Sequence, residues 1–145
     1  MKLTVYSDYT LRVLMYLALH RDKLCTIPEI AGAYGISGNH LMKVVHQLGK
    51  TGMVESVRGK GGGIRLAMAP EEIRIGRVVR ESEGGAPIVE CFSEQNTCRI
   101  APSCRLAKVL GDAFGALYAS LDEYTLADLV VRPAAMTRQL RVQAA

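Results

Sequence analysis

The sequence predicts a mostly α-helical fold with a small β wing: a winged helix-turn-helix followed by one long helix. Two short amphipathic segments flank a turn that contains Gly35, which is the arrangement of a helix-turn-helix. A glycine-rich stretch separates two runs of alternating apolar residues, 54–58 and 64–68, as expected of a β-hairpin. Residues 105–124 then carry a long helical pattern of apolar residues.

Length and charge limit the classes of function. The 145 residues suffice for about one domain, and the absence of a long apolar run or a cleavable leader predicts a cytoplasmic protein with no membrane contact. Residues 1–80 hold twelve Lys/Arg and six Asp/Glu, a balance of +6, whereas residues 81–145 hold six and eight, a balance of −2. A basic first half joined to a mildly acidic second half favours binding of a polyanion by the first half.

The first two helices are expected from their caps and their apolar spacing. Ser7 is a capping residue type, and the following apolar residues predict a helix from about Asp8 to Leu19. Thr26 precedes the segment IPEIAGAYG, whose proline and glutamate are typical of a first helical turn. Gly35 ends this second helix.

The third helix, expected at about Gly38–Gly49, has one apolar and one polar face. At 100° per residue Leu41, Val44, Val45 and Leu48 share one stripe, which should face the core. The opposite stripe is polar and partly cationic. An ordinary solvated face has the same pattern, but no acidic residue occurs within 30–54, which favours a helix that lies in the major groove of DNA. The residues of this region expected to contact DNA are Ser37, Asn39, His40, Lys43, His46 and Lys50.

The hairpin that follows has a glycine-rich tip. It resembles a phosphate-binding loop, but no Gly-Lys-Ser/Thr ending and no helix follow it. A glycine backbone that carries Arg58 and Lys60 instead favours a wing, which can approach phosphates or place an arginine in the minor groove. Arg58 and Lys60 are therefore expected to contact DNA.

The chain divides into four expected parts. Residues 1–80 form the winged helix-turn-helix with a connector helix, and residues 81–104 form a cysteine loop. A dimerisation helix at 105–131 and a flexible tail at 132–145 complete the chain.

The long helix presents more apolar surface than a small domain needs. Its seam contains Leu106, Leu110, Ala113, Leu117 and Leu121, and Gly111, Gly115 and Ala119 would permit close approach of another helix. The seam could pack on its own domain. Pairing with a second copy is favoured because helix-turn-helix proteins commonly read two half-sites as symmetric dimers.

Three of the four cysteines, Cys91, Cys98 and Cys104, fall within fourteen residues. In a reducing compartment this clustering favours metal or redox chemistry over a disulfide. Their spacing, with six and five residues between them, matches neither zinc knuckles nor common ferredoxin runs, so spacing alone identifies no metal. Cys25 is a candidate fourth ligand, although a lone cysteine is more often simply buried.

Six segments of the chain, taken in order, resemble the nitric-oxide-sensing repressors of the Rrf-two family of winged-helix iron–sulfur regulators. They are SDYTLRVLMYLAL, YGISGNHLMKVVHQL, VRGKGGGIRL, IRIGRVVRESE, CRIAPSCRL and YTLADLV, and with their surroundings they span roughly residues 1–131. The resemblance implies a homodimer that binds double-stranded promoter DNA. It also implies an iron–sulfur cluster, 4Fe–4S rather than 2Fe–2S, whose destruction by nitric oxide releases the DNA. By position it implies Cys91, Cys98 and Cys104 as cluster ligands, with Asp8 from the partner subunit as the fourth.

Other interpretations stay open at this point. Asp8 has an ordinary role too, since an acid in a first helical turn interacts favourably with the helix dipole. Iron-sensing or cluster-status-sensing members of the same family are alternatives, as is a zinc-containing DNA-binding protein. The cluster-status branch carries a histidine just after its third cysteine, whereas this chain has Ala107 and Lys108 there. No set of nucleophile, base and acid stands out, so no enzyme is expected.

Overall fold

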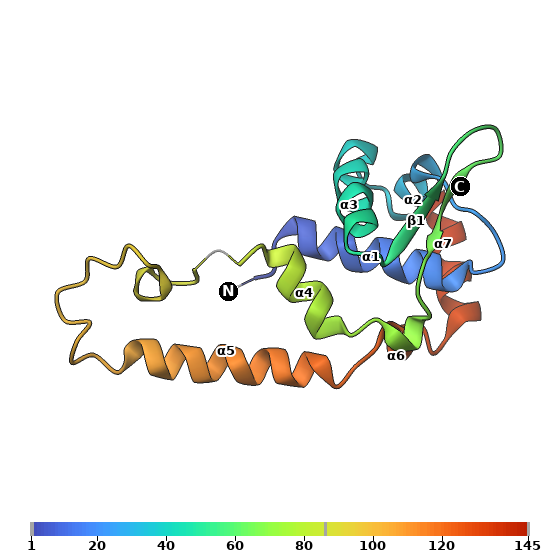
Figure 1. Cartoon of the computed structure of the whole chain (residues 1–145). Coiled ribbons are helices and arrows are strands. Elements are labelled where there is room, and N and C mark those ends of the chain that lie inside the picture. Colours follow the sequence, from blue (N-terminus) through green and yellow to red (C-terminus); the bar gives the residue numbers. More distant parts are fainter. Residues whose placement is uncertain (1, 86, 145) are drawn as a thin grey trace.

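A computed structural model describes residues 2–85 and 87–144. Residues 1, 86 and 145, which belong to the predicted DNA-binding part, cysteine loop and tail, lie outside the described residues. Figure 1 shows a winged-helix body from which a long helix and a loop extend to one side. The elements are α1 (Val5–Leu19), α2 (Ile27–Tyr34), α3 (Gly38–Lys50), β1 (Val54–Val57), β2 (Gly63–Leu66), η1 (Pro70–Glu72), α4 (Ile75–Glu83), η2 (Glu90–Phe92), α5 (Leu106–Asp122), α6 (Leu126–Leu129) and α7 (Pro133–Ala144).

The predicted fold class, mostly helical with a small β wing, is confirmed. β1 and β2 form a two-stranded antiparallel sheet with Val54 opposite Leu66. Within the described residues no helix is long and apolar enough to cross a bilayer.

Helix α1 begins three residues before the predicted start. The predicted cap, Ser7, lies inside the helix, and Thr4 caps it instead by accepting a hydrogen bond from the Ser7 N–H at 3.1 Å. The prediction was wrong because Thr4 is also a capping residue type, and because a distant side chain holds Thr4 in place. Glu83 accepts hydrogen bonds from the Thr4 N–H (2.9 Å) and the Thr4 hydroxyl (3.0 Å).

Helices α2 and α3 form the predicted helix-turn-helix. Thr26 and Glu29 make a reciprocal capping box at the start of α2, and Gly35 ends it with φ 65°, a left-handed conformation that favours glycine. Ser37 is the N-cap of α3, as predicted, but its side chain makes no capping hydrogen bond. The predicted apolar stripe of α3 is buried throughout: Leu41, Val44, Val45 and Leu48.

The wing is attached to the connection between α1 and α2. The Cys25 N–H donates to the Ile64 carbonyl at 2.9 Å, and the Ile64 N–H donates to the Cys25 carbonyl at 2.7 Å. Gly63 permits this approach, since a Cβ there would lie 2.6 Å from the Cys25 carbonyl oxygen. The base of the wing is therefore held by backbone contacts that leave no room for a side chain.

The core gathers around α1, and the chain returns to it after the long helix. Leu14, Leu41 and Leu126 are fully buried in one cluster, although Leu126 belongs to α6, far along the chain. The Leu126 N–H donates to the Ile73 carbonyl at 2.9 Å. The segment beyond α5 therefore completes the core of the winged helix.

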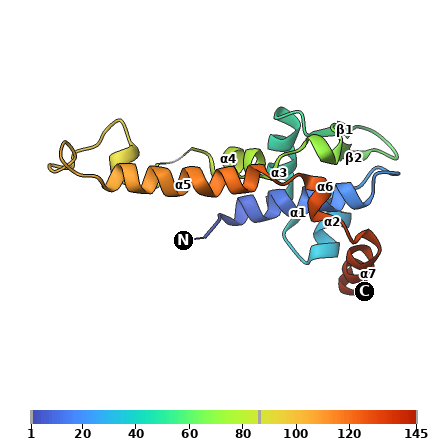
Figure 2. The same ribbon diagram turned by 90° about the horizontal axis from the view of Figure 1, so that it is seen from below.

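Helix α5 lies beside α4 in both views (Figures 1 and 2) and buries none of its residues fully. Its C-terminal end is attached to α4, because the Asp122 carboxylate pairs with Arg80 and lies where a Cβ on Gly76 would be. The predicted seam is divided between two environments. Leu110, Leu117 and Leu121 are half-buried against their own chain, whereas Leu106 is 52% exposed. Val109, which was not part of the predicted seam, is 58% exposed.

The C-terminal segment differs from the expected flexible tail. Pro133–Ala144 form α7, which packs against α2. Figure 2 shows α7 at the end of the molecule remote from the cysteine loop. Met136 and Leu140 are half-buried and lie one helical turn apart. The sequence of this segment showed no persuasive helical periodicity, so the helix was not predicted.

Candidate DNA-binding face and cysteine loop

The residues expected to contact DNA lie on one side of the molecule. Helix α3 and the wing project on the side opposite α5 (Figure 1). None of the ion pairs in the described part of the chain uses the lysines or arginine expected to bind phosphate. All eight predicted side chains are exposed: Ser37, Asn39, His40, Lys43, His46, Lys50, Arg58 and Lys60.

One predicted DNA contact also touches α1. The His40 ring lies 6.0 Å from the Tyr9 ring, centroid to centroid, with the planes tilted by 43°. Val5 and Lys43 line the same small pocket. The first turns of α1 therefore contact the recognition helix, α3, directly beside Asp8.

The three clustered cysteines lie on an exposed loop held by its own hydrogen bonds. Cys98 is exposed, Cys91 and Cys104 are partly exposed, and all three are free thiols. Two successive turns connect Cys98 to Cys104. The Ala101 N–H donates to the Cys98 carbonyl (3.2 Å), and the Cys104 N–H donates to the Ala101 carbonyl (3.3 Å). The first N–H of α5, from Leu106, donates to the Cys104 sulfur at 3.4 Å.

The three cysteine thiols are the type of ligand that an iron–sulfur cluster needs, but a single chain does not bring them together. Over residues 2–85 and 87–144, no three His, Cys, Asp or Glu side chains come together as a metal site. Three free thiols on one loop are nevertheless the ligand type that such clusters use. None of the described residues of the loop from Gly84 to Cys104 is buried, so closing it around a group would break no core contact.

Cys25 is unsuited to be the fourth ligand. Its side chain is fully buried, and burial raises the pKa of its thiol to about 11. It lies in the connection between α1 and α2, at the opposite end of the molecule from the cysteine loop (Figures 1 and 2). A thiolate is the form that binds metal, so this environment favours a structural role.

Asp8 lies in the first turn of α1 with its side chain 48% exposed. Both of its oxygens are 3.0 Å from Arg12, one from Nε and the other from Nη2. Arg12 also lies 5.6 Å from the centroid of the Tyr34 ring. Asp8 is therefore accessible, but it is bound by an arginine of its own helix.

Glu83 connects the cysteine loop to the start of α1, a contact that the sequence analysis missed. Its carboxylate accepts hydrogen bonds from Thr4 and from the Ser7 hydroxyl. Partial burial opposes its ionisation, but these hydrogen bonds outweigh that effect and hold the pKa of Glu83 below its usual range. No local pattern could have revealed a contact between residues 76–79 positions apart.

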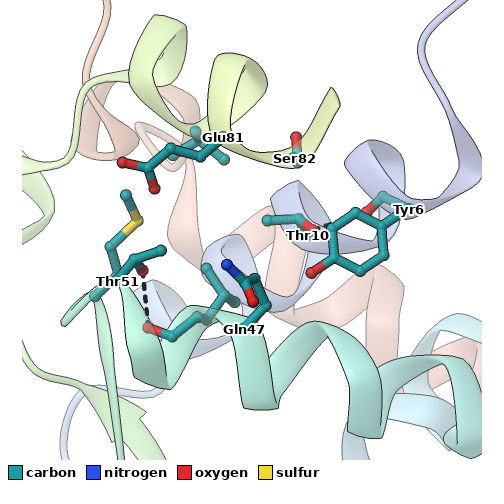
Figure 3. Close-up of a pocket in the computed structure, with 9 residues that line it drawn as sticks. Tyr6, Thr10, Gln47, Thr51, Glu81 and Ser82 are labelled. Atoms are coloured by element: carbon teal, nitrogen blue, oxygen red, sulfur yellow. Dashed lines mark hydrogen bonds between the residues drawn. The ribbon is translucent and has the colours of Figure 1, made fainter. Parts of the chain in front are cut away.

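Helices α1, α3 and α4 meet at a small crevice. Figure 3 shows Tyr6 and Thr10 of α1, Gln47 of α3 with Thr51 directly after it, and Glu81 and Ser82 of α4 around the crevice. The connector helix α4 thus contacts both the helix that carries Asp8 and the recognition helix.

Comparison with known proteins identifies the family. Residues 3–132 match the sequence profile of Rrf2, described as an iron-dependent transcriptional regulator. The chain belongs to the Rrf2 family. It is 56% identical over 132 residues to the HTH-type transcriptional regulator NsrR of Bacillus subtilis, covering 90% of each chain. It is 48% identical over 143 residues to NsrR of Geobacillus kaustophilus, covering 97% of each.

Solved structures of Rrf2-type regulators share the fold. IscR of T. potens superposes with a TM-score of 0.72 at 27% identity, covering 90% of this chain and 86% of that one. CymR, the global cysteine regulator of B. subtilis, gives 0.70 at 27% identity, covering 89% and 95%. Since its relatives are transcriptional regulators, this Rrf2 protein is a DNA-binding transcriptional regulator and not an enzyme, as predicted.

Proposed function

We propose that this Rrf2 protein is a homodimeric repressor that senses nitric oxide through an iron–sulfur cluster, 4Fe–4S rather than 2Fe–2S. The observation that carries the proposal is the set of three free thiols, Cys91, Cys98 and Cys104, on one exposed loop. It occurs in a chain that is about half identical to NsrR regulators over 90% of its length.

Four side chains would hold the cluster. Cys91, Cys98 and Cys104 would come from one subunit, and Asp8 of the partner subunit would supply an oxygen. When bound, the cluster supplies iron that reacts with nitric oxide, most readily where a weakly held oxygen replaces a thiolate. Arg12 would have to release at least one oxygen of Asp8, which is favourable only while the cluster is present.

The exposed stripe of α5 supports the dimer. Leu106, Val109, Ala113 and Ala116 are exposed and lie within about 80° of one another at 100° per residue. A row of exposed apolar side chains on a long helix is typical of an interaction surface. A second α5 is the partner that symmetry favours, because two recognition helices would then read two half-sites of promoter DNA.

The contacts of α1 connect the proposed cluster site to the recognition helix. The first turns of α1 touch Glu83 at the edge of the cysteine loop and His40 on the recognition helix. Release of Asp8 would free this end of α1, and with it the position of α3. Because both half-sites must be engaged at a fixed spacing, a small change in either subunit would weaken the whole complex.

Anaerobic purification of the full-length protein tests the proposal. We expect brown protein with iron and sulfide in equal amounts, and a loss of its visible absorbance on titration with nitric oxide. Retardation of a promoter fragment should disappear over the same range of nitric oxide. Cys98→Ala should abolish both cluster and DNA binding, whereas the matched control Cys25→Ala should keep both.

Three results would contradict the proposal. Colourless protein that holds zinc would make it a zinc-containing DNA-binding protein. A cluster that responds to iron supply but not to nitric oxide would make it an iron or cluster-status sensor. Cluster-free protein that binds the promoter as tightly as the loaded form would exclude a cluster-controlled switch altogether.

A further inference from the structure

A shallow apolar groove crosses the DNA-binding face beside the polar stripe of α3. It runs from Ile27 and Pro28 at the start of α2, past Asn39 and Met42 of α3, to Ile64 at the base of the wing. Met42 is 53% exposed and is the one large apolar side chain that α3, all of whose residues are described, presents to solvent. An apolar side chain at this position has no role in the core.

The charges around the groove select its occupant. Every residue described as lining it lacks a carboxylate. The one acid of α2, Glu29, is already bound by the Lys23 ammonium and by the Tyr16 hydroxyl, the latter at 2.9 Å. The exposed cations Lys43 and Arg58 lie on the recognition helix and the wing that the groove joins. The surroundings therefore suit a polyanion that also presents an apolar group.

We propose that Met42 is a specificity-determining residue that contacts a thymine 5-methyl group in the operator. The inference rests on the proposed function as a DNA-binding repressor. In the major groove the thymine methyl is the apolar group that base edges display, and it distinguishes T from C. The Met42 thioether is flexible and has no strong hydrogen-bonding group, so it suits a methyl contact.

Asn39 supports this assignment from the same helix face. Asn39 and Met42 are three residues apart, lie on neighbouring parts of one helix surface, and line the same groove. An asparagine can make two hydrogen bonds to adenine in the major groove. An adenine and a thymine methyl occur together in each A·T pair, so the two side chains would jointly favour A·T pairs under the start of α3.

Replacement of single thymines by deoxyuridine tests the contact, because it removes the methyl group and keeps base pairing. A duplex is first selected from a random pool with the full-length, cluster-loaded protein. Each thymine is then replaced in turn, and the dissociation constant is measured by fluorescence anisotropy. The proteins compared are the wild type, Met42→Ala and Met42→Leu. Val131→Ala is the control, since Val131 is an exposed apolar residue in the connection between α6 and α7, outside α3 and the wing.

One thymine in each half-site should be sensitive to the replacement. We expect about a 4-fold loss per half-site, since a buried CH₂ group contributes about 0.8 kcal/mol and about 1.4 kcal/mol corresponds to tenfold. The same replacement should have no effect on Met42→Ala, an intermediate effect on Met42→Leu, and the full effect on Val131→Ala. Circular dichroism checks that each variant is folded.

A selected duplex in which no thymine is methyl-sensitive would overturn the inference and leave the repressor function intact. Equal sensitivity in the wild type and in Met42→Ala would overturn it as well, because another residue would then make the contact. Failure to select any duplex would instead contradict DNA binding itself, and the inference with it.

Discussion

Removal of the exposed apolar stripe of α5 should separate the proposed dimer. Leu106 and Val109 are 52% and 58% exposed in the single chain, so about half of each side chain is available for burial by a second copy. Full burial of a leucine or valine side chain contributes about 1.5–3 kcal/mol, which gives about 1 kcal/mol for each half-exposed one. A symmetric dimer contains two of each residue, so the double substitution to alanine should cost about 4 kcal/mol.

This cost corresponds to a dissociation constant of the dimer that is about 10³-fold larger, since about 1.4 kcal/mol is tenfold. Sedimentation velocity over a range of protein concentrations measures it directly. Gly115→Ala is the matched control, because nothing lies within 4 Å of a Cβ at this position and the residue faces away from the stripe. It should leave the dimer intact and stabilise the helix by about 1 kcal/mol.

Two results would refute the reasoning. If the Leu106→Ala/Val109→Ala protein dimerises as tightly as the wild type, another surface joins the subunits. If Gly115→Ala separates the subunits and the double variant does not, the helices pair through their small residues instead of the apolar stripe.

Three further predictions concern the winged-helix body. The pKa of the Cys25 thiol is raised from 9.0 to about 11 in the folded chain, so unfolding releases the thiol proton at alkaline pH. In thermal denaturation the wild type should therefore lose stability between pH 9 and 11 more steeply than Cys25→Ala. Parallel stability curves for the two proteins would contradict this. The pKa of Glu83 is lowered in the folded chain, so its carboxylate stabilises the fold above the ordinary carboxyl pKa range, and this stabilisation is lost as the pH falls through the folded-state pKa. The melting temperature of Glu83→Gln should therefore fall less steeply than that of the wild type as the pH is lowered. Gly63→Ala brings a Cβ to 2.6 Å from the Cys25 carbonyl oxygen. This substitution should lower the free energy of unfolding by about 1–3 kcal/mol and weaken DNA binding. An unchanged melting temperature would show that the wing moves freely.

Much of the fold could be predicted because its determinants are local. Thr26 with Glu29, and the left-handed Gly35, fix α2 by contacts within a few residues. The stripe on α3 that includes Leu41 predicted its core face correctly. The positions of the cysteines in the chain were likewise visible without a structure, although their spacing identified no metal.

Other features could not be predicted because they depend on residues far apart in the chain. Thr4 and not Ser7 caps α1, since Glu83 binds it from 79 positions away. Met42 lies on the edge of the polar stripe of α3, and only the neighbouring surfaces of α2 and the wing make it part of a groove. A helical projection of α3 could have indicated that Met42 is exposed, but not that α2 and the wing lie beside it.

The sequence by itself determined the winged-helix class, the polar face of the recognition helix and the clustered thiols, because helical periodicity, caps and glycine turns act over a few residues. The tertiary structure decided that Cys25 is buried, that Glu83 joins the cysteine loop to α1, and that α5 exposes Leu106 and Val109. The physical reason is that burial and hydrogen bonding between distant segments depend on how the helices pack, which no local pattern specifies.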